Sequence, residues 1–198
     1  MTHALVVIDM QNDFCPGGAL AVTDGDSVVA GINARMAQAG AVILTQDWHP
    51  AGHSSFASQH QDRAPMDTVT MPYGTQVLWP DHCVQGSLGA EFHPDLDTDR
   101  AEMILRKGFR PDIDSYSAFF ENDRTTQTGL DGYLRTRGIT DLDFAGLATD
   151  FCVAWSALDA ARLGYRVRVL TSLCRGIDVN GSMAQALDNL RTAGVELV

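Results

Sequence analysis

The chain has 198 residues, of which 45% are apolar and 8% aromatic, so it is long enough to bury one sizeable core but too short for two independent ones. We therefore expect one domain over residues 1–198. The 25 acidic residues outnumber the 14 basic ones, and the formal net charge of −11 opposes binding to nucleic acid or anionic lipid. No apolar run is long enough to span a bilayer and the first residues lack a basic signal region, so we expect a cytoplasmic protein without nucleic-acid or membrane partners.

The four cysteines are scattered along the chain without any Cys-x-x-Cys spacing. In a reducing compartment this pattern indicates core residues and one reactive thiol rather than a disulfide framework.

The first part of the chain predicts a strand, a helix and a second strand. Residues 5–8 form an apolar run typical of a central parallel strand, and this run ends at Asp9. Apolar residues then repeat at helical spacing over 28–37, with Asp24 or Asp26 as the expected N-cap. Residues 41–45 form a second buried run. This unit predicts a parallel sheet with a right-handed crossover.

The periodicity disappears over about 47–95, and five of the six histidines fall in this stretch. A loop-rich segment of this length within a compact domain is usually functional. We expect it to be an insertion that carries a metal site.

The second part of the chain returns to alternating strands and helices. Strands are predicted at 103–105, 142–145, 167–170 and 195–198, and helices at 130–138, 153–163 and 183–193. The complete pattern predicts an α/β fold, a three-layer α/β/α domain with a mostly parallel, doubly wound central sheet. In such folds the functional site lies at the carboxyl ends of the strands.

Cys152 is the candidate nucleophile, since it lies on the first turn of a predicted helix directly after a strand. The helix dipole is expected to lower the pKa of such a thiol, and neighbouring amides can form an oxyanion hole. A small buried cysteine between helix and sheet is the alternative. Asp9 and Lys107 end two other strands, where they would act as a base and a stabilising cation beside Cys152.

A metal site is indicated by Asp47 and His49, whose side chains point the same way if the strand remains extended. His82 is the expected third ligand, and this donor set suits Zn²⁺, Fe²⁺ or Mn²⁺. The competing histidines of the same segment are His53, His60 and His93. For His60 and His93 we favour solvated or hydrogen-bonded roles. His53 is left open between a ligand, a support for a ligand and a structural residue.

Aromatic residues of the loops indicate a slot for a flat ligand. Phe14 and Trp79 would flank it, with Trp48 and Tyr116 lining the same pocket, although loop aromatics are more often packing anchors.

These motifs together closely resemble the bacterial nicotinamidase/pyrazinamidase family, within the isochorismatase-like cysteine hydrolases. The matching segments are residues 5–14, 47–50 with His53 and Ser55-Phe56, 79–84, Lys107-Gly108, 114–119 and 146–153. They cover essentially the whole chain. The Asp-x-His pair combined with Trp-Pro-x-His-Cys is specific to the nicotinamidase branch, whereas the catalytic triad is shared with other amidases of the superfamily.

The resemblance implies hydrolysis of nicotinamide to nicotinate and ammonia through a cysteine thioester, with pyrazinamide as a further substrate. It implies Cys152 as nucleophile, Asp9 as general base and acid, and Lys107 as the third triad member. It also implies one divalent metal ion held by Asp47, His49 and His82. Substrate-binding residues would be Phe14, Trp79, Tyr116 and Leu147.

The resemblance further implies a cis peptide bond between Leu147 and Ala148. This bond would turn the Ala148 amide toward the oxyanion, beside the amide of Cys152.

Three alternatives to this function remain open at the level of sequence. They are an amidase for a carbamoyl or ureido substrate, a vinyl-ether hydrolase of the isochorismatase type, and a catalytically silent protein that binds a small aromatic ligand. The presence of Cys152 disfavours the vinyl-ether hydrolase, and the metal motif disfavours the carbamoyl amidase. Both a monomer and a homo-oligomer fit the sequence.

Overall fold

The fold is built on a six-stranded parallel sheet in the order β5-β2-β1-β6-β7-β8, seen in a computed structural model that describes residues 3–198. The strands are β1 (His3–Ile8), β2 (Val42–Asp47), β5 (Met103–Lys107), β6 (Asp141–Leu147), β7 (Arg166–Arg175) and β8 (Glu196–Leu197). The predicted parallel α/β fold is confirmed. Most strands extend beyond the predicted bounds, whereas β8 is shorter than the predicted 195–198. The strands β2 and β5 include Asp47 and Lys107 as their last residues.

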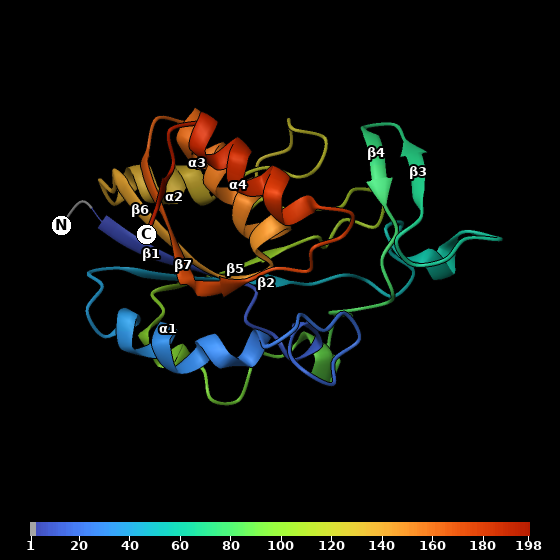
Figure 1. The fold of residues 1–198 in the computed structure, drawn as a ribbon, viewed down its shortest axis with the longest axis horizontal. Coiled ribbons are helices and arrows are strands. Elements are labelled where there is room, and N and C mark those ends of the chain that lie inside the picture. Colours follow the sequence, from blue (N-terminus) through green and yellow to red (C-terminus); the bar gives the residue numbers. More distant parts are fainter. Residues whose placement is uncertain (1–2) are drawn as a thin grey trace.

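Helices cover both faces of this sheet. Figure 1 shows α1 on one face and α2, α3 and α4 on the other, which gives the three expected layers. The helices are α1 (Val29–Met36), α2 (Leu130–Thr136), α3 (Ala154–Arg162) and α4 (Ser182–Thr192). None of these described helices is long and apolar enough to cross a membrane.

The predicted cap of the first helix is wrong. Asp24 has a left-handed backbone with φ of 54° and its side chain accepts no capping hydrogen bond. A short 3₁₀ turn, Gly25–Val28, contains Asp26 and leads directly into α1, so the chain enters this helix without a side-chain cap.

The strand order reverses direction between β1 and β6. From β1 the chain winds outward through β2 to β5, and from β6 it winds the other way through β7 to β8. In doubly wound folds such a reversal opens a crevice at the carboxyl ends of the two central strands, where ligands bind. Asp9 directly follows β1, and the turn that contains Cys152 follows β6, so both residues lie at this crevice.

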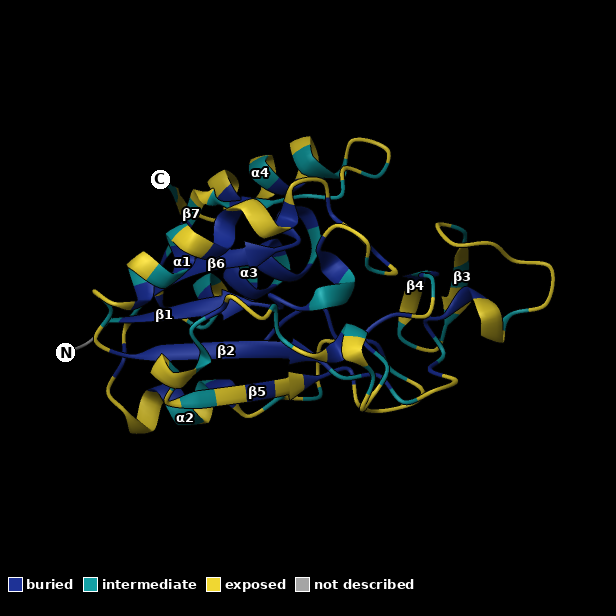
Figure 2. Cartoon of the chain, turned by 90° about the horizontal axis from the view of Figure 1, so that it is seen from below, coloured by how far each residue is buried: buried dark blue, intermediate teal, exposed yellow. Residues whose placement is uncertain are grey.

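The central strands are buried on both faces, as their continuous apolar runs predict. Figure 2 shows β1, β2 and β6 buried, whereas the edge strand β5 carries exposed residues. Gly146 lies opposite Ile8 in the pairing of β1 with β6 and has φ of +115°. A Cβ at position 146 would lie 2.8 Å from the Ile8 nitrogen, so only glycine fits this close approach.

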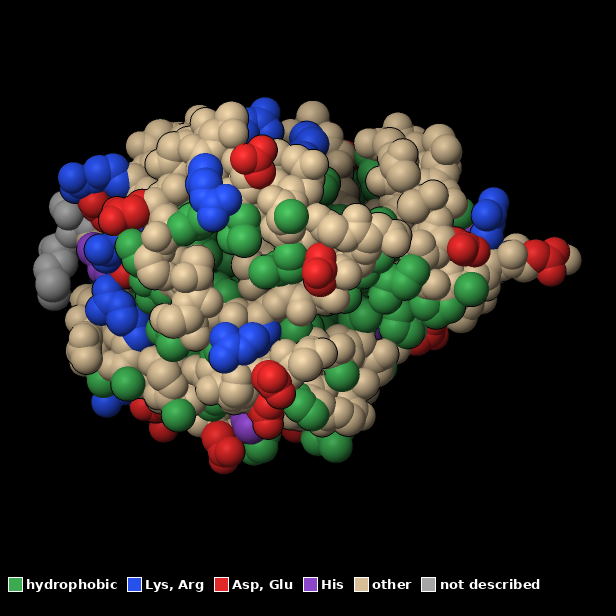
Figure 3. All heavy atoms as spheres, in the orientation of Figure 1, with side chains coloured by type: hydrophobic (Ala, Val, Ile, Leu, Met, Phe, Trp, Pro, Cys, Tyr) green, Lys and Arg blue, Asp and Glu red, His purple; other side chains and the backbone are tan. Residues whose placement is uncertain are grey.

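An antiparallel hairpin lies in the segment that was predicted to be loop-rich. It consists of β3 (Thr68–Met71) and β4 (Gly74–Val77), and in the space-filling view it forms a lobe beside the main body (Figure 3). Its strands are short and largely exposed, so they lack the buried apolar run that reveals the strands of the central sheet. The sequence pattern therefore did not reveal the hairpin.

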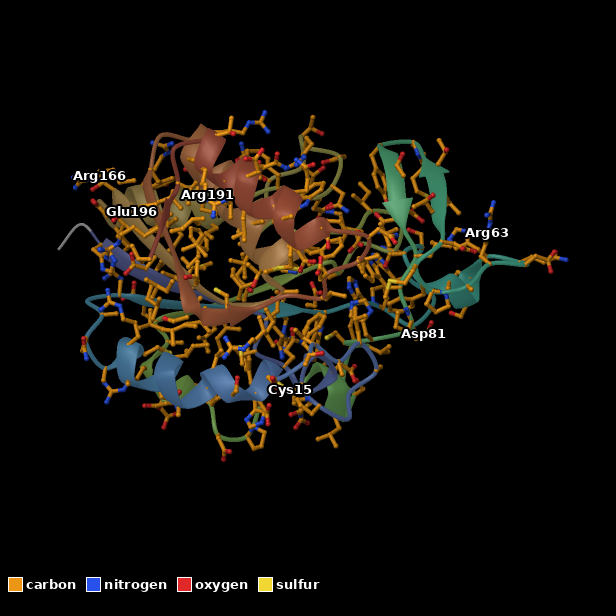
Figure 4. The ribbon with its side chains drawn as sticks, viewed as in Figure 1. Cys15, Arg63, Asp81, Arg166, Arg191 and Glu196 are labelled. Carbon is orange, nitrogen blue, oxygen red and sulfur yellow. The ribbon has the colours of Figure 1, made fainter. Side chains whose placement is uncertain are left out.

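The two ends of the sheet differ in what they carry. Figure 4 labels Arg166 and Glu196, which begin β7 and β8, at the opposite end of the molecule from Asp81. Asp81 directly precedes His82, so the histidine-rich segment lies beyond the carboxyl ends of the strands.

A buried carboxylate stabilises the centre of the sheet near its amino end. Asp143 of β6 is fully buried and accepts hydrogen bonds from Arg168 at 2.7 and 2.9 Å and from Arg35 at 2.7 Å. Burial raises the pKa of Asp143, but the hydrogen bonds from Arg168 and Arg35 outweigh it and hold the pKa below its usual value. The carboxylate therefore ties α1 and β7 to the central strand in its charged form.

We expect Asp143→Ala to lower the free energy of unfolding by about 2–4 kcal/mol, because it leaves two partly buried guanidinium groups without their anion. Urea unfolding at neutral pH measures this change. Since the folded-state pKa is lowered, the stabilisation is present at neutral pH and is lost as the pH falls below about 4.

The matched control is Asp141→Ala, two residues earlier in the same strand. Asp141 pairs with Arg166, whose side chain is 81% exposed, so its loss should cost less than about 1 kcal/mol. Equal losses in the two variants would contradict the importance of the buried network.

Candidate active site

Three of the predicted site residues converge at the crevice between β1 and β6. The Lys107 ammonium lies 2.8 Å from Asp9 Oδ2 and 3.5 Å from Cys152 Sγ. Asp9 and Lys107 are at most 1% exposed and Cys152 is 6% exposed. The structure thus brings together an acid, a cation and a thiol from segments that are distant in sequence.

Lys107 is surrounded by acceptors. It contacts Asp47 Oδ1 as well as Asp9, and it donates to the Ser115 carbonyl at 3.0 Å. Burial alone would lower the pKa of Lys107, but Asp47 and Asp9 raise it well above its usual value. Burial likewise raises the pKa of Asp47, yet Lys107 and His49 hold it well below its ordinary range. The lysine is therefore a permanent cation at the centre of the site.

Asp9 is held from one side by Thr45. The Thr45 hydroxyl donates to Asp9 Oδ1 at 2.6 Å and accepts from the Asp9 amide at 3.2 Å. The second oxygen, Oδ2, faces Lys107 but makes no well-aligned hydrogen bond among residues 3–198. Burial raises the pKa of Asp9 and Lys107 opposes this rise, with burial the larger effect. A carboxylate with a raised pKa is a better proton acceptor.

The environment of Cys152 differs in two respects from the prediction. The turn that carries it, Thr149–Val153, is π-helical and precedes α3. Burial raises the pKa of the thiol well above its usual value, although Lys107 opposes this effect. The expected lowering of the pKa by a helix dipole is therefore wrong for the resting site. The thiol rests protonated, so a neighbouring base is required to activate it.

The peptide bond between Leu147 and Ala148 is cis, as the family resemblance implied. It directly precedes the π-helical turn, and Ala148 and Cys152 both line the same cavity.

A second cluster consists of Asp47, His49 and His82, all buried. Asp47 Oδ2 lies 3.7 Å from His49 Nε2 and 3.8 Å from His82 Nε2, and one ligand atom of each residue lies within 4.8 Å of the others. The other ring nitrogens contact backbone carbonyls, His49 Nδ1 that of Gly108 and His82 Nδ1 that of Pro80, each at 2.8 Å.

This hydrogen bonding fits a divalent metal ion. A carbonyl can only accept, so each Nδ1 must carry a hydrogen, and in the neutral form of each ring Nε2 keeps its lone pair facing Asp47. Metal-bound histidines are generally oriented in this way by their second nitrogen. Asp47 is fixed in turn by Gln11, which accepts from the Asp47 amide and donates to its carbonyl, both at 2.8 Å. The structure thus places a candidate metal site directly beside Lys107.

The remaining histidines of the segment have other partners. His53 contacts the Ser55 hydroxyl at 2.7 Å and the Ile113 carbonyl at 3.3 Å, and its ring lies 4.4 Å from that of His49. Both of its nitrogens are engaged, which favours a supporting role behind His49. His60 bonds to the Ser54 carbonyl, and His93 accepts from the Asp95 amide, so both are hydrogen-bonded outside the cluster.

A small cavity of about 320 Å³, solvent at its mouth included, lies between the two clusters and is lined by Asp47 and His82 of one and Cys152 of the other. The predicted residues Phe14, Trp79 and Tyr116 line it, together with Asp47, His82, Ala148 and Cys152. The other lining residues, which were not predicted, are Leu20, Asp114, Phe151 and Ile177. Larger open depressions elsewhere on the surface contain none of the reactive groups, so we identify this smaller cavity as the site.

The aromatic walls of this cavity pack edge to face. Trp79 contacts Phe151 with ring centres 4.9 Å apart, and Phe14 contacts His82 at 5.5 Å. Leu147 was also predicted to bind substrate, but its side chain is fully buried and lies near Gly25 rather than among the lining residues. Phe151 is the sequence neighbour of Cys152, and this is the one sequence signal that could have identified Phe151 as a lining residue.

Known proteins resemble this chain over nearly its whole length. A family profile described as the isochorismatase domain matches residues 3–198. The chain belongs to the isochorismatase family. It is 51% identical over 195 residues to the nicotinamidase of Acinetobacter baylyi, with 98% of this chain and 91% of that protein covered. Within the family it therefore groups with the nicotinamidases.

Solved structures of this family agree with the fold. The nicotinamidase pyrazinamidase of Acinetobacter baumanii is 52% identical, with a TM-score of 0.99 over 100% of this chain and 95% of that one. The pyrazinamidase of Pyrococcus horikoshii in complex with zinc is 33% identical, with a TM-score of 0.80 over 100% and 99%.

We expect Gly108→Ala to weaken metal binding by about 10–100-fold, because an added Cβ would lie 2.7 Å from His49 Nδ1 and displace the ring. Chelator competition followed by metal analysis measures this loss. Gly138→Ala is the matched control, since Gly138 has nearly the same φ, +65° against +67°, with no atom within 4 Å of the added Cβ. Equal metal loss in both variants would show that backbone strain, not the ring contact, is responsible.

Proposed function

We propose that this chain hydrolyses nicotinamide to nicotinate and ammonia through a thioester on Cys152, and that it hydrolyses pyrazinamide in the same way. The observation that carries the proposal is the convergence of Asp9, Lys107 and Cys152 at one end of an aromatic cavity whose wall includes Asp47 and His82. This arrangement offers a nucleophile for a carboxamide and a slot for the ring attached to it.

The first half of the reaction forms the thioester. Asp9 takes the proton of the Cys152 thiol, and the sulfur attacks the carboxamide carbon. The amides of Ala148 and Cys152 stabilise the oxyanion. The C–N bond then breaks, and Asp9 returns its proton to the nitrogen so that ammonia leaves. Lys107 remains charged throughout and stabilises the anionic forms of Asp9 and Cys152.

The second half releases nicotinate. A water molecule attacks the thioester carbon while Asp9 accepts one of its protons. The C–S bond breaks, and the sulfur leaves as thiolate and recovers a proton from Asp9. The raised pKa of Asp9 suits this exchange, because the group must both accept and donate a proton in each cycle.

Asp47, His49 and His82 would hold one Zn²⁺, Fe²⁺ or Mn²⁺ ion, with water completing its shell. When bound, the ion supplies a Lewis acid that accepts the pyridine nitrogen and orients the ring. Phe14 and Trp79 would enclose the two ring faces, and Tyr116 would complete the binding site. The carboxamide would then extend toward Cys152 at the far end of the cavity.

Residues 1–198 would act as one isochorismatase-like domain, because the site takes side chains from β2, β5, the turn after β6 and the histidine-rich segment. A catalytically silent binding protein with the same cavity would need neither the buried thiol nor the base beside it. An amidase for carbamoyl or ureido substrates would not require the Asp/His/His cluster. An assay of ammonia release from nicotinamide, with metal analysis of the same sample, separates the three possibilities.

We expect Cys152→Ala to lower kcat by about 10⁴-fold or more, because no other group can form the thioester. The coupled ammonia assay measures this loss, and metal content should equal that of the unmodified protein. Cys174→Ala, a buried cysteine in β7, is the control and should retain activity. Appreciable amidase activity in Cys152→Ala would refute the nucleophile assignment.

Removal of the metal with a chelator should abolish most nicotinamide turnover, since the ring loses its anchor. Iodoacetamide should still alkylate Cys152, because the base and the thiol remain in place. Readdition of Zn²⁺, Fe²⁺ or Mn²⁺ one at a time then identifies the ions that restore activity. Full activity in protein shown to be free of metal would contradict the role of the cluster.

A further inference from the structure

Gln76 is a buried polar residue on an otherwise exposed hairpin. Its side chain is 1% exposed, whereas its neighbours on β4, Gly74 and Thr75, are exposed and Val77 is half-buried. A glutamine is rarely buried unless its amide is fully hydrogen-bonded. The hairpin therefore directs one polar side chain toward the main body of the protein.

The amide of Gln76 is satisfied on both sides. Nε2 donates to Asp114 Oδ2 at 2.8 Å, to the Val77 carbonyl at 2.7 Å and to the Tyr116 hydroxyl at 2.9 Å, so its two hydrogens serve three acceptors. Oε1 accepts from Tyr73 at 3.1 Å and from Asn122 at 3.2 Å. The carboxylate and the carbonyl only accept, which fixes the orientation of the amide.

Two of these partners, Asp114 and Tyr116, line the cavity, and a third lining residue is linked through them. The Trp79 indole donates to the Tyr116 hydroxyl at 3.0 Å, so this oxygen receives hydrogen bonds from both Trp79 and Gln76. The ring centres of Trp79 and Tyr116 lie 6.2 Å apart with their planes at 80°. The hydroxyl is thus the point at which the hairpin and the aromatic wall meet.

We propose that Gln76 is a positioning residue for the aromatic substrate, which makes the β3–β4 hairpin a part of the binding site. By fixing the Tyr116 hydroxyl and the Asp114 carboxylate, Gln76 sets the orientation of Trp79 against the substrate ring. This inference rests on the proposed function, since it assumes that a flat ring occupies the cavity. It does not involve the bond chemistry at Cys152.

The test is Gln76→Met, which keeps the length of the side chain and removes its hydrogen bonds. We expect KM for nicotinamide to rise about tenfold while kcat stays within about twofold. The lost hydrogen bonds support binding of the ring equally in the ground state and in the transition state. The rate of Cys152 alkylation by iodoacetamide should not change. A merely structural role would instead lower kcat, the alkylation rate and the melting temperature together.

A double-mutant cycle shows whether Gln76 acts through Tyr116. If it does, Gln76→Met combined with Tyr116→Phe should raise KM little more than the larger single change. If the fold-increase in KM of the double variant equals the product of the two single increases, the proposal is overturned. Gln38→Met, the same substitution at an exposed glutamine, is the control and should leave KM unchanged.

A second variant tests the proposal if Gln76→Met fails to fold. Gln76→Glu keeps the volume and the oxygen that accepts from Tyr73 and Asn122, and it removes the donor to Tyr116 and Asp114. KM should rise again, with kcat retained. An unchanged KM in either folded variant, or loss of the fold in both, would overturn the positioning role. Failure of the unmodified protein to release ammonia would instead refute the proposed function, so the two failures are distinct.

Discussion

The site depends on one buried cation. The Lys107 ammonium lies between Asp9 and Asp47 and within 3.5 Å of the Cys152 sulfur. Burying an ammonium group is costly unless anions compensate it, and here two carboxylates do so. Because Asp9 belongs to the proposed bond chemistry and Asp47 to the candidate metal site, the lysine couples the two halves of the site electrostatically. Removing the lysine would leave two buried carboxylates without their cation.

The sheet explains why these charges meet. Asp47 and Lys107 are register partners at the last positions of β2 and β5, and Asp9 follows β1, so parallel pairing alone brings three chain-distant groups to one edge. The reversal of strand order beside β1 then adds the turn after β6, which supplies Cys152. The doubly wound topology of the isochorismatase family thus brings together the candidate nucleophile, base and cation, and the histidine-rich segment adds part of the lining of the proposed ligand slot.

That slot has a different physical character from the catalytic end. Its walls come from loops, and their aromatic rings contact one another edge to face. Loops need support to hold such geometry, and the polar network around Gln76, Asn122 and Asp114 provides it from the hairpin side. The proposed active site thus combines a buried charged centre with an aromatic wall that is held by hydrogen bonds.

Local patterns in the sequence determined the central strands, the α/β class and the candidate groups at the strand ends. Burial of a strand or helix imposes a regular spacing of apolar residues, and this spacing can be recognised in the sequence. Alternation along an extended chain also paired Asp47 with His49. Only the tertiary structure decided what depends on distant neighbours. The hairpin lacks a buried apolar run, and the partners of Gln76 lie about 40 residues away or more in Asp114, Tyr116 and Asn122. The pKa of Cys152 rises because burial, which a helix-start pattern does not reveal, outweighs the opposing effect of Lys107.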